Sequence, residues 1–207
     1  LGWKQLSGTF KEIRHMKVVG LFLLAYWFYI DGVDTIVKMA VDYGVSLNFP
    51  DSALITALLL VQFIAFPSAL LFSLLSKKIG VKESIMVGII SYTIITFLAY
   101  FMSQMWHMFI LAGLVGIFQG GIQALSRSLY TRIIPKEKSA EFFGFYNMLG
   151  KFAAVIGPAM MGTITLLTGN IRYGILSILL LFILGGFFLL KVNIEEGSRI
   201  ANEYLSK

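Results

Sequence analysis

Three charged residues interrupt the first long apolar stretch of this 207-residue chain. In "WFYIDGVDTIVKMA" (27–40), Asp31, Asp34 and Lys38 stand among aromatic and aliphatic residues. Asp34 and Lys38 are four residues apart and can neutralise each other on a helix, and Lys38 is near enough to the end of the stretch to reach water. We therefore favour a structural role for that pair. Asp31 has no such neighbour and stands beside the helix-weakening Gly32, so we predict that Asp31 handles substrate or protons.

A second deep charge lies in "FYNMLGKFAAVIGPAMMG" (145–162). Counted from Glu141, Lys151 lies about 15 Å into the predicted span, close to the middle of a bilayer. Asn147 precedes it by one turn on the same helix face. A lone ammonium there costs at least ~3 kcal/mol, so we expect a partner or a watery cavity, with Asp31 as the nearest candidate counter-charge. An ion pair that only fixes helix packing remains the alternative.

A polar stripe marks "LAGLVGIFQGGIQALSRSLYTRIIP" (111–135), where Gln119, Gln123 and Ser126 follow one another at helical spacing. In lipid such a stripe turns inward, either to line a cavity or to form interhelical hydrogen bonds, and the pattern does not decide between the two. Gly116 and Gly120 permit close helix packing on the same stretch. Pro67 and Pro158 are expected to kink their helices.

The elements that must position these residues are transmembrane helices. Hydrophobic residues make up 57% of the chain and charged residues only 14%, with a mean hydropathy of +0.82. Continuous apolar runs of about 20 residues predict helical spans, whereas a β-barrel would show alternation in ~10-residue pieces. The fold class predicted is an all-α membrane protein with six transmembrane helices. The six spans are predicted at 18–43, 52–76, 83–102, 105–130, 140–168 and 170–191.

The placement of the basic residues predicts the orientation of these spans. Of the 17 lysines and arginines, only Lys38 and Arg172 fall on the outer side and Lys151 inside a span; the other fourteen share one side. The positive-inside rule therefore places both termini in the cytoplasm, most simply across a bacterial inner membrane. Residues 1–17 are predicted to form an amphipathic connector helix at the membrane surface, and 192–207 a cytoplasmic tail with a short helix or disorder. The same placement argues against nucleic acid as a partner.

Enzyme chemistry finds little support in the sequence. The chain has no cysteine and only two histidines, His15 and His107, neither of which is deep or spaced as a metal pair. No nucleophile elbow, zinc-protease motif or phosphate-binding loop occurs. We therefore predict no enzyme activity, no catalytic residue, no metal and no cofactor.

The segments "GLVGIFQGGIQALSRSLYTRIIPKEKSAEFFGFYNMLGKFAAVIGPAMMG" (113–162) and "FLLAYWFYIDGVDTIVKMA" (22–40) carry a resemblance to a known family. They resemble the C-terminal half of a major facilitator superfamily (MFS) transporter, and more narrowly the bacterial "unknown major facilitator" family related to vacuolar amino-acid effluxers. The resemblance implies twelve helices in two halves, each half built from two three-helix inverted repeats. It also implies that the first and fourth spans here line the central cavity and that Lys151 lies near the seam between halves.

We therefore expect the C-terminal half of a secondary active transporter that moves a small solute by alternating access, with amino acids as a candidate substrate and protons as a candidate coupling ion. The expected partners are the lipid bilayer, the N-terminal six-helix half and a small-molecule substrate, and the isolated half is expected to self-associate. The alternative is a six-helix membrane scaffold or binding module without transport activity. The predicted pathway residues are Asp31, Asp34, Gln119, Gln123, Ser126, Asn147 and Lys151.

Overall fold

The computed structural model describes residues 8, 12, 13 and 15–203, and within them it contains six helical segments long and apolar enough to span a membrane. The prediction of six spans is thus confirmed. The first four are α2 (Lys17–Ser46), α3 (Asp51–Ile79), α4 (Val81–Tyr100) and α5 (Met105–Ile133). The fifth comprises the short helix η1 (Lys136–Lys138), α6 (Ser139–Ala153) and α7 (Ile156–Thr168); the sixth comprises α8 (Ile171–Ser177) and α9 (Leu179–Leu190).

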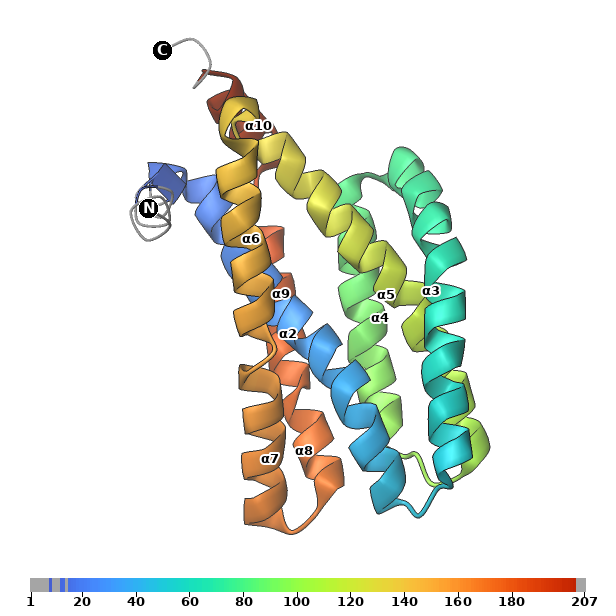
Figure 1. The fold of residues 1–207 in the computed structure, drawn as a ribbon. Coiled ribbons are helices and arrows are strands. Elements are labelled where there is room, and N and C mark those ends of the chain that lie inside the picture. Colours follow the sequence, from blue (N-terminus) through green and yellow to red (C-terminus); the bar gives the residue numbers. More distant parts are fainter. Residues whose placement is uncertain (1–7, 9–11, 14, 204–207) are drawn as a thin grey trace.

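The spans run alternately up and down in one bundle, and the described ends of the chain lie at the same end of it (Figure 1). In Figure 1, α3 and α5 form one flank and α6 and α7 the other, with α2 crossing between them. The loops that carry most of the basic residues lie at the end marked by the two termini, which we term the basic end.

Helices α3 and α5 pack with their backbones in close approach. A Cβ atom added to Gly120 would lie 2.1 Å from the carbonyl oxygen of Ala65, and one added to Gly116 would lie 2.9 Å from that of Val61. No side chain fits at these distances, so glycine at both positions is what brings the two helices together. The small-residue spacing seen in the sequence is therefore a packing motif between α3 and α5.

Helices α4 and α8–α9 cap each other at their ends. The Lys82 ammonium, near the start of α4, donates to the carbonyls of Leu190 and Val192 at the end of α9, at 2.8 and 2.7 Å. The Arg172 guanidinium, near the start of α8, donates to the carbonyls of Tyr100 and Met102 at the end of α4, both at 3.0 Å. Each cation thus satisfies carbonyls that a helix end leaves unpaired. Helix α4 is the third of the first three spans, and α8–α9 is the third of the last three. Each of the two cations lies near the start of its span, so the two contacts occupy corresponding places.

The two proline-containing spans differ. Helix α3 continues through Pro67 for 29 residues without interruption. The fifth span is interrupted at Ala154 and Val155, just before Pro158, and continues as α7. A proline ring clashes with the carbonyl four residues earlier, which here is that of Ala154, so the break falls where the proline places it. The single helix predicted over 140–168 is in fact two helices.

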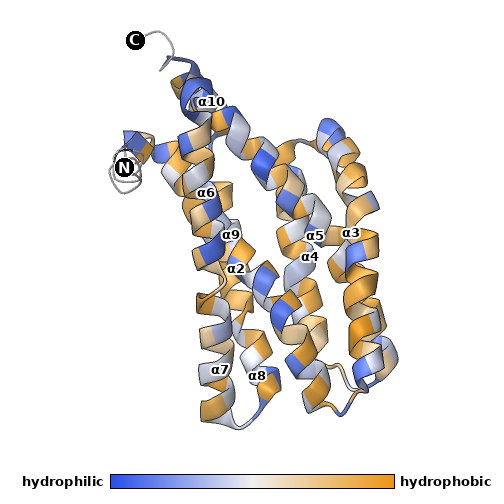
Figure 2. Cartoon of the chain, viewed as in Figure 1, coloured by the Kyte–Doolittle hydropathy of each residue, from blue (hydrophilic) through white to orange (hydrophobic). Residues whose placement is uncertain are grey.

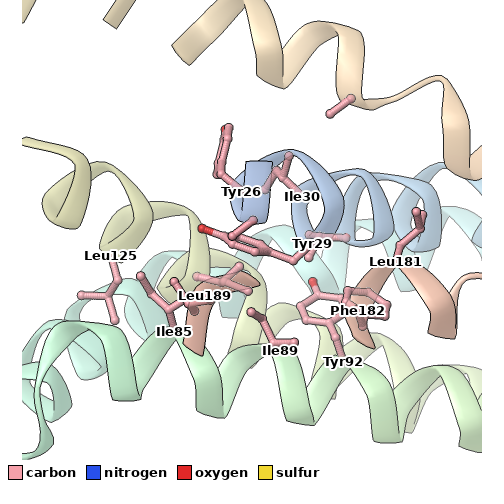
Figure 3. Close-up of a cluster of buried hydrophobic side chains, with 14 of the residues drawn as sticks. Tyr26, Tyr29, Ile30, Ile85, Ile89, Tyr92, Leu125, Leu181, Phe182 and Leu189 are labelled. Carbon is pink, nitrogen blue, oxygen red and sulfur yellow. The ribbon is translucent and has the colours of Figure 1, made fainter. Parts of the chain in front are cut away.

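The bundle core is rich in aromatic residues. Tyr29, Tyr92 and Phe182 are fully buried between α2, α4 and α9 (Figure 3), with the rings of Tyr92 and Phe182 stacked at 5.5 Å. Many large apolar side chains are also exposed on the outside of the bundle, as expected for contact with lipid, and hydrophobic residues predominate along most of the ribbon (Figure 2). Burial is uneven, because only 17% of the most apolar window is buried in α3 and in the fifth span, against 61% in α2. These two spans present open apolar faces.

At the basic end, α10 (Ile194–Glu203) packs against α5 and α2, with Gly197 close to Val18 and Ile133. The predicted tail thus contains a short helix. Glu12 pairs with Lys138 of the short helix η1. Most of the predicted connector helix over 1–17 lies outside the described residues.

Candidate functional site

A polar cavity of about 510 Å³ lies between α2, α5 and α6. Its walls hold one carboxylate, two cationic side chains, two amides and two tyrosines. The lining residues are Tyr26, Ile30, Asp34, Gln123, Arg127, Tyr146, Asn147, Gly150 and Lys151. Four of the seven predicted pathway residues, Asp34, Gln123, Asn147 and Lys151, therefore meet in one place.

Helix α2 forms one wall because Tyr26, Ile30 and Asp34 are spaced by four residues and so share a face. The Tyr26 ring stacks on Tyr146 of α6 with centroids 4.1 Å apart, which joins the two helices by an aromatic contact. Gly150 lies beside this pair, and a Cβ there would be 3.1 Å from the Tyr26 hydroxyl oxygen.

The other two walls also follow helical spacing. On α6, Asn147 and Lys151 are four residues apart and exposed, with Lys151 in the last turn before the break. On α5, Gln123 and Arg127 are four residues apart and exposed. Both cations therefore reach the cavity from separate helices, and the amide of the residue one turn earlier accompanies each.

Neither cation is neutralised by Asp34. Between described residues the ion pairs are Glu12 with Lys138 and Arg199 with Glu203, and both lie at the basic end, outside the cavity. Asp34 and Lys38, predicted to neutralise each other, form no ion pair at contact distance either, although the Lys38 ammonium still acts electrostatically on the Asp34 carboxylate. The cavity therefore holds separated charges of both signs that a polar or charged solute could contact.

Asp31, three residues before Asp34, does not line this cavity. Its carboxylate is buried, with the residue 1% exposed, and accepts hydrogen bonds from the backbone N–H of Gly157 at 3.0 and 3.1 Å. The Thr35 hydroxyl donates to the same carboxylate at 3.3 Å. The expected counter-charge relationship between Asp31 and Lys151 is therefore wrong, because α2 turns Asp31 toward α7 and Asp34 toward the cavity.

The polar stripe on α5 separates into three environments. Gln123 lines the cavity, whereas Ser126 is fully buried and hydrogen-bonds the Tyr29 hydroxyl at 2.7 Å and the Ile122 carbonyl at 2.6 Å. The Gln119 side-chain oxygen is buried without a partner among the described residues and lies outside the cavity lining. Of the two alternatives left open for the stripe, Gln123 therefore lines a cavity and Ser126 forms an interhelical hydrogen bond.

Arg127 and the two tyrosines of the cavity were not among the residues predicted for the pathway. Arg127 was counted only among the basic residues of the cytoplasmic side, although it lies within the predicted fourth span of 105–130 and within α5. Its spacing of four residues from Gln123 was the signal that could have placed it on the polar stripe. Tyr26 and Tyr146 gave no signal that distinguishes them from the many other aromatic residues of the chain.

A second, smaller cavity of about 80 Å³ has an apolar lining from α2, α3, α4, α5, α7 and α8. Tyr43, which contributes to it, has its hydroxyl bound to the Ala99 carbonyl at 2.8 Å. This cavity offers no charged group to a ligand, so the polar cavity is the candidate site.

The chain matches a known protein family over nearly all of its length. The family described as "Vacuole effluxer Atg22 like" matches residues 1–202. The chain belongs to this Atg22-like family. It is also 40% identical over 201 residues to YxiO of Bacillus subtilis, an uncharacterized MFS-type transporter, with 97% of the chain and 47% of that protein covered.

Fungal relatives extend the comparison. The Atg22-like chain is 32% identical to Autophagy-related protein 22 of Yarrowia lipolytica, covering 99% of the chain and 36% of that protein. It is 29% identical to the Saccharomyces cerevisiae protein of the same name (strain S288c), covering 98% and 40%. The chain spans half the length of these relatives or less. The family is thus one of MFS-type membrane transporters and not an enzyme family, in agreement with the resemblance inferred from the sequence.

Proposed function

We propose that this chain is the C-terminal half of a secondary active transporter and that the polar cavity is its share of the solute pathway. Three observations support the proposal: membership of the Atg22-like family, coverage of half or less of each relative, and a cavity that gathers polar groups from three spans. The cavity carries the proposal, because polar and charged groups at membrane depth are costly and mark solute or ion pathways. A twelve-helix transporter would alternate access by rocking its two halves around the site.

The missing partner in this proposal is a six-helix N-terminal half. Its natural docking surfaces are the open apolar faces of α3 and of the α6–α7 span. In the isolated chain these faces would be available for contact with a second copy, so we propose that the isolated half self-associates. The complete protein would reside in a bacterial inner membrane as a multi-pass protein, with the basic end in the cytoplasm.

We propose amino acids as the substrate class. An amino acid carries a carboxylate and an ammonium a few ångströms apart, and the cavity offers Arg127 and Lys151 to the first and Asp34 to the second. Guanidinium and ammonium groups bind carboxylates by charge-assisted hydrogen bonds, and a carboxylate does the same for an ammonium. The resemblance to amino-acid effluxers points to the same class.

We propose protons as the coupling ion, with Asp34 as the group that binds them. Asp34 is the acidic residue of the cavity lining and forms no ion pair with a described residue. Its carboxylate can therefore exchange a proton or meet a substrate ammonium in the same space. A substrate and a proton that each bind one state more tightly would shift the equilibrium between the two orientations.

Transport by the complete protein in liposomes tests the proposal. A panel of radiolabelled amino acids and sugars is offered with and without an imposed proton gradient. We expect at least one amino acid to accumulate inside when the gradient is present and to equilibrate only when it is absent. Failure to move any member of the panel would favour a scaffold or binding module and would contradict the proposal.

Replacement of Asp34 tests its coupling role. Asp34→Asn should abolish gradient-driven accumulation, and any remaining exchange of substrate should need a higher substrate concentration, because the neutral amide no longer attracts the substrate ammonium. Asp42→Asn is the matched control, since Asp42 is an exposed acid about two turns after Asp34, near the end of the same helix. Normal accumulation by the Asp34→Asn variant would remove Asp34 from the coupling mechanism.

A further inference from the structure

The break between α6 and α7 leaves backbone groups that a continuous helix would have paired. With α7 beginning at Ile156, the N–H of Gly157 belongs to the first turn, where no carbonyl of the same helix is in position to accept it. Pro158 follows and has no N–H to satisfy. Inside a membrane an unpaired N–H costs several kcal/mol, so a break at this depth requires an acceptor from elsewhere.

The acceptor comes from α2. Both carboxylate oxygens of Asp31 lie within hydrogen-bond distance of the Gly157 nitrogen, at 3.0 and 3.1 Å. Thr35, one turn later on α2, orients the carboxylate through its hydroxyl at 3.3 Å. A negative charge at the first turn of a helix is also favoured by the partial positive charge of the helix N-terminus. Asp31 therefore caps a helix that is remote in sequence.

The close contact between α2 and α7 also requires glycine at position 157. A Cβ atom at this position would lie 1.9 Å from the Thr35 hydroxyl oxygen and 2.9 Å from an oxygen of Asp31. Any other residue would push α7 away from α2. By contrast, a Cβ at Gly162 on α7 or at Gly144 on α6 would meet nothing within 4 Å. The tight approach is thus specific to the point at which the carboxylate meets the helix end.

We propose that Asp31, Thr35 and Gly157 form a latch that fixes the broken fifth span against α2 and thereby positions Lys151 in the cavity. Lys151 lies in the last turn before the break, and Asp34 lies one turn after Asp31 on α2. The latch therefore sets the separation of Asp34 and Lys151, two of the three charged residues that line the cavity. Asp31 is in this account a positioning residue and does not touch the solute. The structural part stands alone, while its consequence for transport rests on the proposed function.

Spin-label distances in the complete transporter test the latch. This chain has no cysteine, so labels can be introduced at Val45 and Leu166, which are exposed near the far ends of α2 and α7, once cysteines elsewhere in the protein are replaced. In the parent protein we expect one narrow distance distribution. In Asp31→Ala and Gly157→Ala the population of a second, displaced arrangement should rise about tenfold, as expected for one lost buried charge-assisted hydrogen bond.

Conservative and matched variants separate the latch from general damage. Asp31→Asn keeps an oxygen that can accept from Gly157, so its distribution should stay narrow. Gly144→Ala and Gly162→Ala should also leave the distribution unchanged. If Asp31→Ala does not reach the membrane, Gly157→Ala and Asp31→Asn carry the test. The latch would be overturned if Gly157→Ala left the spin-label distance distribution unchanged. It would also be overturned if Gly162→Ala broadened that distribution as much as Gly157→Ala does.

Kinetics then connect the latch to the cavity. With an amino acid that the complete protein transports as the probe, Gly157→Ala should raise KM about tenfold with a smaller change in the maximal rate, because Lys151 loses its position. A narrow distribution that persists while KM rises would contradict the positioning role. A protein that transports nothing but shows the expected distances would refute the proposed function and leave the latch intact.

Discussion

The second spans of the two three-helix halves, α3 and α6–α7, each contain a proline and are nevertheless built differently. Helix α3 is continuous over 29 residues, whereas the other span is divided into helices of 15 and 13 residues. Proline removes one backbone donor and crowds one carbonyl in both cases. The sequence feature that the two spans share is therefore not what distinguishes them.

The difference lies in what each span packs against. Helix α3 lies against α5 through glycines, and the atoms that crowd Gly116 and Gly120 include the backbone carbonyl oxygens of Val61 and Ala65. The fifth span lies against α2 through Asp31, which can accept a hydrogen bond from a helix end. A proline permits a break in the helix. A hydrogen-bond acceptor on a neighbouring helix stabilises the break inside the membrane, because it pairs the backbone N–H that the break leaves free. Helix α3 is thus a continuous packing element, whereas the α6–α7 span is divided and contributes its first helix to the cavity wall.

The largest effect should come from forcing the α3–α5 contact apart. In Gly120→Ala the new methyl group would meet the Ala65 carbonyl at 2.1 Å, and because a backbone atom cannot rotate away, α3 must shift as a whole. We expect a loss of about 3 kcal/mol, at the upper end of overpacking costs, seen as a lower unfolding temperature in detergent. Gly113→Ala, whose methyl would meet its nearest atom at 3.9 Å, is the control. Equal stability of the two variants would contradict the rigid contact.

A smaller effect should come from removing Pro158, and no effect from removing Pro67. Pro158→Ala restores the N–H that would let α6 and α7 join, and joining returns Gly157 to a helical bond and leaves Asp31 buried without its partner. We expect about a tenfold lower initial rate of transport, the change that a 1.4 kcal/mol penalty produces. Pro67→Ala should transport normally, since α3 is already continuous. Similar transport rates in Pro158→Ala and Pro67→Ala would contradict the claim that the break in the fifth span matters for transport.

The smallest effects should come from the third spans, where the two halves are alike. Lys82→Met and Arg172→Met each remove a cation that binds two carbonyls at a helix end. Because both contacts are partly exposed, we expect each variant to lose about 1 kcal/mol, measured as comparable decreases in unfolding temperature. Lys77→Met is the control, as an exposed lysine at the end of α3. A loss confined to one of the two variants would show that the reciprocal caps are not equivalent.

The number of spans could be predicted from the sequence because continuous hydropathy over ~20 residues is a local property. Asp34, Gln123, Asn147 and Lys151 were among the predicted pathway residues, but the sequence did not predict that these four meet in one cavity. The partner of Asp31 could not be predicted, because depth does not reveal which way a side chain points around the helix. Nor could the break near Pro158, since Pro67 gives the same local signal without a break. Arg127 was missed because it was counted with the basic residues of the cytoplasmic side, although the predicted fourth span of 105–130 already contained it.

The central claim is that solute passes through the cavity between α2, α5 and α6. The most direct measurement is the reactivity of a single cysteine at Asn147, an exposed lining position, toward a hydrophilic thiol reagent in the complete transporter. Leu180→Cys, at an exposed apolar position on α9 outside the cavity lining, is the control. We predict that Asn147→Cys reacts, that a transported amino acid slows the reaction, and that Leu180→Cys does not react. An Asn147→Cys variant that transports normally and stays unreactive, or reacts at the same rate with and without substrate, would contradict the account.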